Sequence, residues 1–113
     1  MTYSHFQVSV PARMLRDAQR IVSERELHLD VADLICDGVR RLVAQLADRP
    51  PGDAWFTVQK HLPRYHEKVV RIMVRMPPGL RDAAEAVEGV DRDSVVIAGM
   101  ALALRLYDTS DDA

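Results

Sequence analysis

The sequence predicts a mainly helical protein with a short antiparallel β-ribbon, built from a strand–helix–helix unit that occurs twice. Two stretches alternate apolar and polar residues and end in proline: HFQVSVP at 5–11 and RIMVRMP at 71–77. Two runs with apolar residues at helical spacing follow each stretch. Alternation is typical of a half-buried strand, whereas spacings of three and four residues are typical of an amphipathic helix.

Composition sets the limits on function. The chain has 113 residues, 48% of them hydrophobic and 28% charged, which suits one compact domain or two very small ones. The formal net charge of -2 gives no general attraction to nucleic acid, so a DNA site would be a local patch. The single Cys36 excludes an internal disulfide, and its apolar neighbours predict a buried thiol. There is no signal-peptide pattern and no apolar run of about 18 residues, so we expect a cytoplasmic protein without a membrane span.

The two predicted strands correspond position by position, at an offset of 66 residues. The inward residues are Phe6, Val8 and Val10 in the first strand and Ile72, Val74 and Met76 in the second. The outward residues are His5, Gln7 and Ser9 in the first strand and Arg71, Met73 and Arg75 in the second. A lone strand leaves backbone N–H and C=O groups unpaired, so the two strands are expected to pair antiparallel. Pairing within the chain is the favoured arrangement, and pairing between chains is the alternative.

A short helix is expected directly after each strand, because proline suits the first turn of a helix. Apolar residues continue at helical spacing after each proline, namely Met14, Ala18, Ile21 and Val22 in the first copy and Leu80, Ala84 and Val87 in the second. The first helix should end near Arg25 and the second near Gly89, where glycine is a natural stop.

A longer helix follows in each copy, with Asp30 and Asp91 as credible N-caps. The apolar positions correspond at an offset of 61, so the first copy has five more residues between its helices, roughly ERELH. Gly38 and Gly99 occupy matched positions in these helices. Because glycine costs a helix up to about 1 kcal/mol relative to alanine, a close helix–helix crossing would explain them.

These patterns divide the chain into a first unit at 1–47, a linker at 48–67, a second unit at 68–107 and an acidic tail at 108–113. The linker has three prolines and a glycine but also carries Trp55, Phe56, Leu62 and Tyr65. Two interpretations remain open for these residues. They pack over the core and hold the halves together, or they form a docking patch for a partner.

The whole pattern resembles two ribbon-helix-helix units in one chain, the fold of the MetJ and Arc type of repressor. The segments VVRIMVRMPPGLRDAAEAV and DRDSVVIAGMALAL carry the resemblance in the second copy. HFQVSVPARMLRDAQRIV and DVADLICDGVRRLV carry it more weakly in the first. The resemblance implies a pseudo-dimer that inserts its two-stranded ribbon in the major groove of double-stranded DNA.

In that family, three alternate strand residues of each unit contact bases, and these positions fall on the six outward residues: His5, Gln7, Ser9, Arg71, Met73 and Arg75. The chemistry of these side chains suits contacts with bases. Arginine bonds bidentately to guanine, glutamine to adenine, serine donates or accepts, and methionine can touch a thymine methyl. The alternative is a solvated ribbon whose charges prevent edge aggregation.

Members of the family also bind DNA phosphates through backbone N–H groups at the start of the longer helix. Here Asp33 and Asp93 stand where phosphate should lie, and they would repel it. Arg92 and Ser94 can compensate in the second copy, but no residue near Asp33 does so in the first. Further candidate phosphate contacts are Arg13, Lys68 and Arg81, each of which fits a solvated surface equally well.

No enzyme or cofactor pattern stands out. The histidines His61 and His66 are five residues apart without a helical i, i+4 pair, so no metal site is expected. No catalytic triad order, glycine-rich phosphate loop or carboxylate pair is present, and the expectation is a protein that is not an enzyme.

The favoured function is a sequence-specific DNA-binding protein, most simply a transcriptional repressor, with self-association on DNA. Two alternatives remain. One is an antitoxin or interaction scaffold that binds a protein partner through Trp55 and Phe56. The other is an accessory DNA-binding protein of plasmid conjugation or partition, which tandem units of this kind also resemble.

Overall fold

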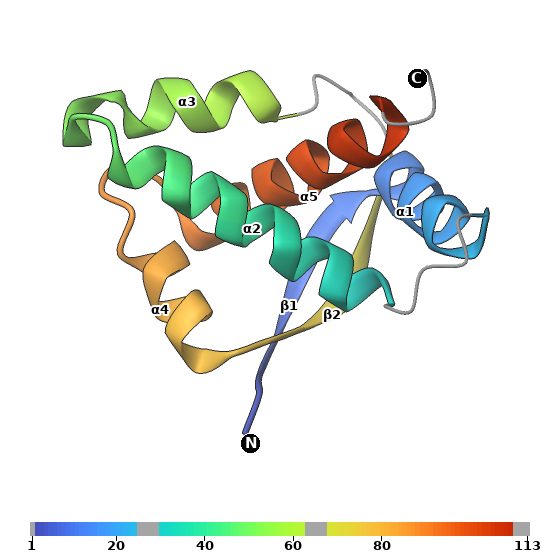
Figure 1. Ribbon diagram of the computed structural model, residues 1–113. Helices are drawn as coiled ribbons and strands as arrows, with labels where there is room; N and C mark the ends of the chain where they lie inside the picture. The colour runs from blue at the N-terminus through green and yellow to red at the C-terminus, as the bar shows by residue number, and fades with distance from the viewer. Residues whose placement is uncertain (1, 25–29, 63–67, 110–113) are drawn as a thin grey trace.

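The structure is a computed structural model, and it describes residues 2–24, 30–62 and 68–109 (Figure 1). Within these ranges the chain is mainly helical and carries one two-stranded antiparallel sheet. The elements in chain order are β1 (Ser4–Pro11), α1 (Ala12–Glu24), α2 (Val31–Ala47), a 3-10 turn (Pro51–Asp53), α3 (Ala54–His61), β2 (Val69–Met76), α4 (Pro78–Glu85) and α5 (Arg92–Thr109). The predicted class, mainly α with a short antiparallel ribbon, is confirmed.

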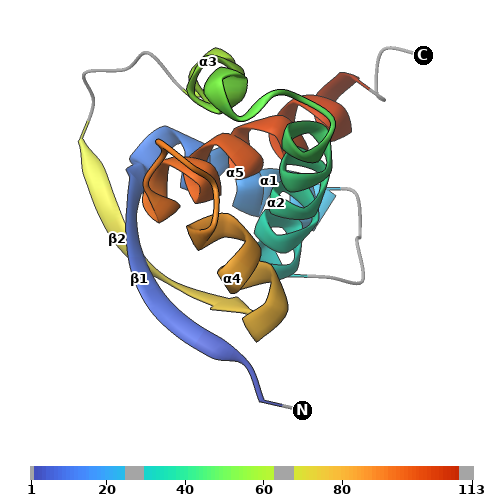
Figure 2. The same ribbon diagram turned by 90° about the vertical axis from the view of Figure 1, so that its left-hand side faces the viewer.

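The ribbon pairs β1 with β2 along their full lengths, from Ser4 opposite Met76 to Pro11 opposite Val69. Figure 2 shows both strands running along one side of the helices, so that one face of the ribbon is covered and the other is open. The covered face carries the predicted inward residues. Val8 and Val74 are fully buried there, whereas Ile72 is only partly buried.

Helices α2 and α5 form the centre of the core and cross at two glycines. A Cβ atom added to Gly38 would overlap the carbonyl oxygen of Gly99, and a Cβ on Gly99 would lie 2.8 Å from the Cα of Val39. Real Cβ atoms essentially never approach backbone so closely, so only glycine allows these helices to meet here. The expected close crossing is therefore confirmed.

The helix ends agree with the sequence in three places and differ in one. Helix α1 follows Pro11 directly, α4 has Pro78 in its first turn, and Asp30 caps α2. The expected end of α4 near Gly89 is wrong, because the helix ends at Glu85. Gly89 instead lies in the following loop with φ of 80°, a left-handed conformation that glycine adopts without strain. The five additional residues expected before α2 fall mostly on residues 25–29, outside the described residues.

The segment expected as a linker contains helix α3, which packs on α5 and α2. Prolines and a glycine surround this stretch, but none lies within it. Its buried residues are Ala54, Thr57 and Val58, at the spacing of one helix face. Leu62 also packs against the core, whereas Trp55 and Phe56 stay 42% and 63% exposed. Tyr65 lies outside the described residues, so the interpretation that these residues pack over the core holds for only part of the set.

Over the described ranges, no helix combines the length and apolar character needed to cross a bilayer.

Candidate nucleic-acid interface

The six outward strand residues lie on the open face of the ribbon in three cross-strand pairs. His5 is opposite Arg75, Gln7 is opposite Met73, and Ser9 is opposite Arg71. All are exposed except Arg75, which is half-buried, and Met73 exposes 56% of its surface. Because side chains alternate along a strand, the register that buries the apolar residues also gathers these six on one surface.

Arg71 is only loosely held. Its guanidinium donates one long hydrogen bond, at 3.5 Å, to Oε1 of Gln7 on the other strand. Both side chains are exposed, and both project from the middle of the open face. Guanidinium and amide groups in this position can turn toward hydrogen-bonding groups of a ligand at little cost.

Arg75 is held by several groups. Its guanidinium lies 3.2 Å from a carboxylate oxygen of Asp30 and 3.6 Å from one of Asp33, at the start of α2. It also lies over the ring of Tyr3, 5.3 Å from the centroid. Its backbone carbonyl accepts a hydrogen bond from Sγ of Cys36 at 3.3 Å, which ties β2 to α2.

The sequence expectation that nothing compensates Asp33 is therefore wrong. Arg75 lies on β2, and its proximity to Asp33 depends on the pairing of β1 with β2. Sequence position alone gives no sign of this contact, because 42 residues separate the two side chains along the chain.

Two of the candidate phosphate contacts, Arg81 of α4 and Arg92 of α5, meet at the ring of Phe6. Their guanidinium carbons lie 4.9 Å and 4.3 Å from its centroid. Arg81 also bonds Ser4 and forms an ion pair with Glu85 at 2.7 Å, while Arg92 pairs with Asp93 at 3.2 Å. This end of the ribbon thus concentrates two arginines beside the start of β1. Sequence reasoning placed Phe6 in the core but missed Ser4 and both arginine contacts with Phe6, because only the strand register brings these residues to α4 and α5.

The remaining phosphate candidates are more scattered. Lys68 is exposed next to β2, and its carbonyl accepts a hydrogen bond from the N–H of Ala12 at 3.0 Å. Arg13, in the first turn of α1, lines a cavity of about 220 Å³ between α1, α3 and α5. The Ser94 hydroxyl donates to Asp91 at 2.7 Å and is therefore engaged within its own helix cap.

Both long helices begin with an aspartate cap. Oδ1 of Asp30 accepts from the N–H of Asp33 at 2.9 Å, and Oδ2 of Asp33 accepts from the N–H of Asp30 at 3.2 Å. Asp91 likewise accepts from the N–H of Ser94 at 3.1 Å. The backbone bond from Asp33, aided by the charge of Arg75, lowers the pKa of Asp30 despite partial burial. The bonds from Ser94 lower the pKa of Asp91.

Burial shifts the pKa of two other titratable groups, Cys36 and His61. The thiol of Cys36 is buried, as the sequence predicts, and burial raises its pKa. His61 lies at the end of α3, and its Nδ1 is buried with no hydrogen-bond partner among the described residues. Burial, followed by the charges of Arg105 and Lys60, lowers the pKa of His61. His66 lies outside the described residues, and within them no three histidine, cysteine or acidic side chains gather as metal ligands would.

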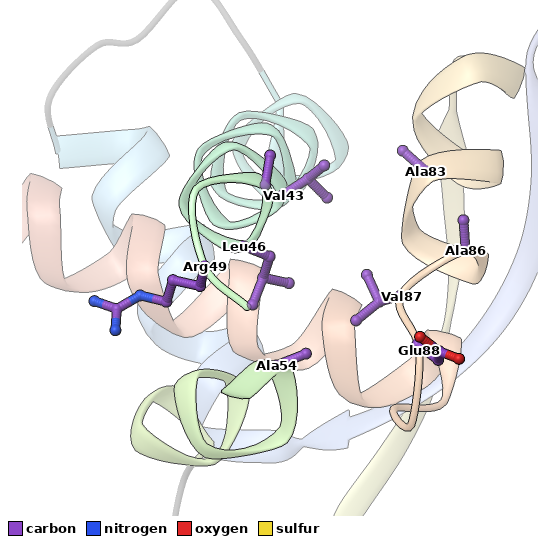
Figure 3. Close-up of a pocket in the computed structure, with 9 residues that line it drawn as sticks. Val43, Leu46, Arg49, Ala54, Ala83, Ala86, Val87 and Glu88 are labelled. Carbon is purple, nitrogen blue, oxygen red and sulfur yellow. The ribbon is translucent and has the colours of Figure 1, made fainter. Parts of the chain in front are cut away.

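A separate apolar groove lies between the end of α2, the start of α3 and the end of α4. It has a volume of about 340 Å³, and Figure 3 shows Val43 and Leu46 on one wall and Ala83, Ala86 and Val87 on the other. Ala54 forms part of its lining. A neighbouring hollow of about 240 Å³ is lined by Trp55, so the exposed aromatic side chain borders this apolar region.

Comparison with known proteins found no matching family model, no matching characterised protein and no matching solved structure.

Proposed function

We propose that this protein binds specific sequences of double-stranded DNA by inserting the β1–β2 ribbon into the major groove, and that it acts as a transcriptional repressor. The observation that carries this proposal is the strand register, which gathers six polar or adaptable side chains on one open face. A two-stranded ribbon has the right width for the major groove, where each base pair presents a distinct hydrogen-bonding pattern.

The second part of this proposal is that the chain is a ribbon-helix-helix pseudo-dimer, with two units related by an approximate two-fold axis. On such an axis, corresponding residues of the two units should meet. Gln7 and Met73 correspond at the offset of 66 residues and lie opposite one another in the ribbon. Gly38 and Gly99 correspond at the offset of 61 and meet where α2 crosses α5. Two independent pairs of equivalent residues thus support the same axis.

The unequal chemistry of the two strands favours an asymmetric DNA site. Arg71 suits a guanine and Gln7 an adenine, while Met73 offers an apolar contact for a thymine methyl. The open face of β1 carries no arginine, whereas β2 places Arg75 opposite His5 and Arg71 opposite Ser9. Phosphate contacts are few, with Arg81 and Arg92 as the best placed, so the dependence of affinity on salt should be shallow.

The test is selection of binding sites from fragmented genomic DNA by the wild-type protein and by an Arg71→Ala/Arg75→Ala variant. The wild type should enrich one short asymmetric motif. Each bidentate arginine–guanine contact contributes about 1–3 kcal/mol, so the variant should lose at least tenfold in affinity for this motif and its selectivity. Selection of the same motif by the variant would refute base contact by the ribbon.

A Trp55→Ser/Phe56→Ser variant serves as the matched control. These residues lie on α3 and are exposed, so their replacement should leave both the fold and the selected motif unchanged. A promoter next to the selected motif would indicate repression, whereas a transfer origin or partition site would indicate a role in plasmid conjugation or partition.

The exposed aromatic residues of α3 favour a second candidate function, an antitoxin or interaction scaffold that binds a protein partner. Trp55 lines the hollow that neighbours the apolar groove, and Phe56, the next residue of α3, is 63% exposed. Exposed aromatic side chains of this kind are common at protein interfaces. Failure of every variant to enrich DNA would favour this candidate.

A further inference from the structure

The two arginines on the open face of the ribbon have very different surroundings. Arg71 has one long hydrogen bond to Gln7, at 3.5 Å. Arg75 lies against two carboxylates, with Asp30 at 3.2 Å and Asp33 at 3.6 Å. If the ribbon enters a major groove, one arginine is available at once and the other must first leave its acidic partners.

The acidic partners of Arg75 are fixed in place. Asp30 and Asp33 hold each other through reciprocal hydrogen bonds between side chain and backbone at the start of α2. The thiol of Cys36 bonds the carbonyl of Arg75, so the same turn of α2 is tied to β2. These bonds therefore favour a position of the carboxylates beside Arg75, from which the guanidinium has to separate when DNA approaches.

Their charge also opposes DNA directly. The start of a helix favours anions because its N–H groups and dipole are positive, and a phosphate would benefit from this position. Two aspartates already occupy it, and at the closest approach of DNA they would face the phosphate backbone. The ion pairs with Arg75 are weak enough to be exchanged, since its side chain is 41% exposed and those of the acids are 59% and 51% exposed.

Building on DNA binding by the ribbon, we propose that Asp30 and Asp33 act as an acidic brake that competes with DNA for Arg75. The brake lowers affinity at the base position that Arg75 faces, and it leaves Arg71 as the dominant base-reading arginine. Arg75 has two roles, neutralising the start of α2 in the free protein and contacting DNA when the carboxylates release it.

The test replaces both acids with asparagine, measuring dissociation constants for the selected duplex by fluorescence anisotropy. Asparagine keeps the oxygen that accepts each capping bond. It removes the charge and replaces the oxygen that faces Arg75 with an amide NH2 group. Asp30→Asn/Asp33→Asn should bind about tenfold more tightly, a gain in the lower half of what one bidentate guanine contact contributes. Its selected motif should gain a stronger guanine preference at the position facing Arg75.

Asp48→Asn is the matched control for charge. Asp48 lies at the other end of α2, about 22 Å from Asp33 at 1.5 Å per residue. This separation exceeds the screening length of about 10 Å at 0.1 M salt, so the control should leave the dissociation constant within about twofold of wild type.

Combining the two asparagine substitutions with Arg75→Ala distinguishes competition for Arg75 from simple repulsion between the acids and DNA. In that background, neutralising the two acids should improve affinity by only about threefold or less, because only screened repulsion is relieved. An equal gain in both backgrounds would overturn competition for Arg75, and so would no gain in either. Thermal unfolding checks that each variant is folded. Asp33→Asn alone, which keeps the Asp30 cap, is a second variant for the same binding measurement.

The same data distinguish failure of the brake from failure of DNA binding. If Arg71→Ala abolishes selective binding but neutralising the acids changes nothing, the brake is overturned and DNA binding stands. If wild type enriches no sequence and no variant binds, both are overturned.

Discussion

Arg71 and Arg75 show how much the surroundings of a residue decide its role. Both are arginines at alternate positions of one strand, and both point to the open face of the ribbon. One lies near a neutral amide and the other near two carboxylates. The same side chain therefore has different freedom at the two positions, and the difference comes from α2 and not from the strand.

Asp30 leads to a prediction about acid stability. Its pKa is lowered by the bond from the N–H of Asp33 and by Arg75, so its ionised form is favoured in the folded state. A lowered aspartate pKa gives stability that is fully present above the unfolded value of about 3.9 and is lost as pH falls through the lower folded value. The free energy of unfolding should therefore drop below about pH 4.

Urea unfolding at a series of pH values measures this loss. Asp30→Asn keeps the cap oxygen without titrating, so its stability should fall less steeply on the acid side than that of wild type. Asp30→Ala removes the cap and should cost about 1 kcal/mol at pH 7. Parallel acid-side curves for wild type and Asp30→Asn would contradict a contribution from Asp30.

The crossing of α2 and α5 is the clearest feature at the scale of elements. Two glycines remove the side chains that would separate the helices, and residues such as Val39, Val95 and Met100 then fill the core around the crossing. Glycine lowers helix propensity, so the close approach must recover that loss through packing.

Gly38→Ala should therefore destabilise the protein by about 2 kcal/mol or more, because the added methyl group meets the backbone of α5 and the fold must separate its helices. Gly79→Ala is the control, since Gly79 lies in α4 with no atom within 4 Å of the added group. That change should be neutral or stabilising by up to about 1 kcal/mol. Equal denaturation midpoints for the two variants would exclude a tight crossing.

At the scale of the whole molecule, residues from both ends of the chain share one core. Phe6 and Val8 of β1 belong to the same buried cluster as Val95 and Met100 of α5. Helix α3 adds Val58 to this cluster and so joins it from the segment between the two halves. Neither half has its own core, because each strand needs the other and α2 needs α5.

Unfolding should consequently be a single cooperative transition. Trp55, the only tryptophan, reports on α3 by fluorescence, while far-UV circular dichroism reports on all helices. The two signals should give the same urea midpoint, as two-state behaviour requires. Val58→Ala should lower the free energy of unfolding by about 2 kcal/mol. Both midpoints should then move together to a lower urea concentration. An earlier fluorescence transition would show that α3 detaches from the remaining core.

Sequence patterns alone predict the two strands, the four helices that follow them, and the caps and glycines of the long helices. These features depend on local rules: alternation, helical spacing, the fixed φ of proline and the hydrogen bonds of aspartate. Local rules also placed the six outward residues on one face, because the period of a strand is two residues.

The groups that surround those residues depend instead on tertiary packing. Asp33 meets Arg75, and Arg81 and Arg92 meet Phe6, through a strand register that joins segments far apart in sequence. Trp55 and Phe56 are exposed because α3 rotates its smaller residues, Ala54 and Thr57, toward α5 and α2. Contacts of this kind depend on how elements pack against one another, and the spacing of residues along one element carries no information about that packing.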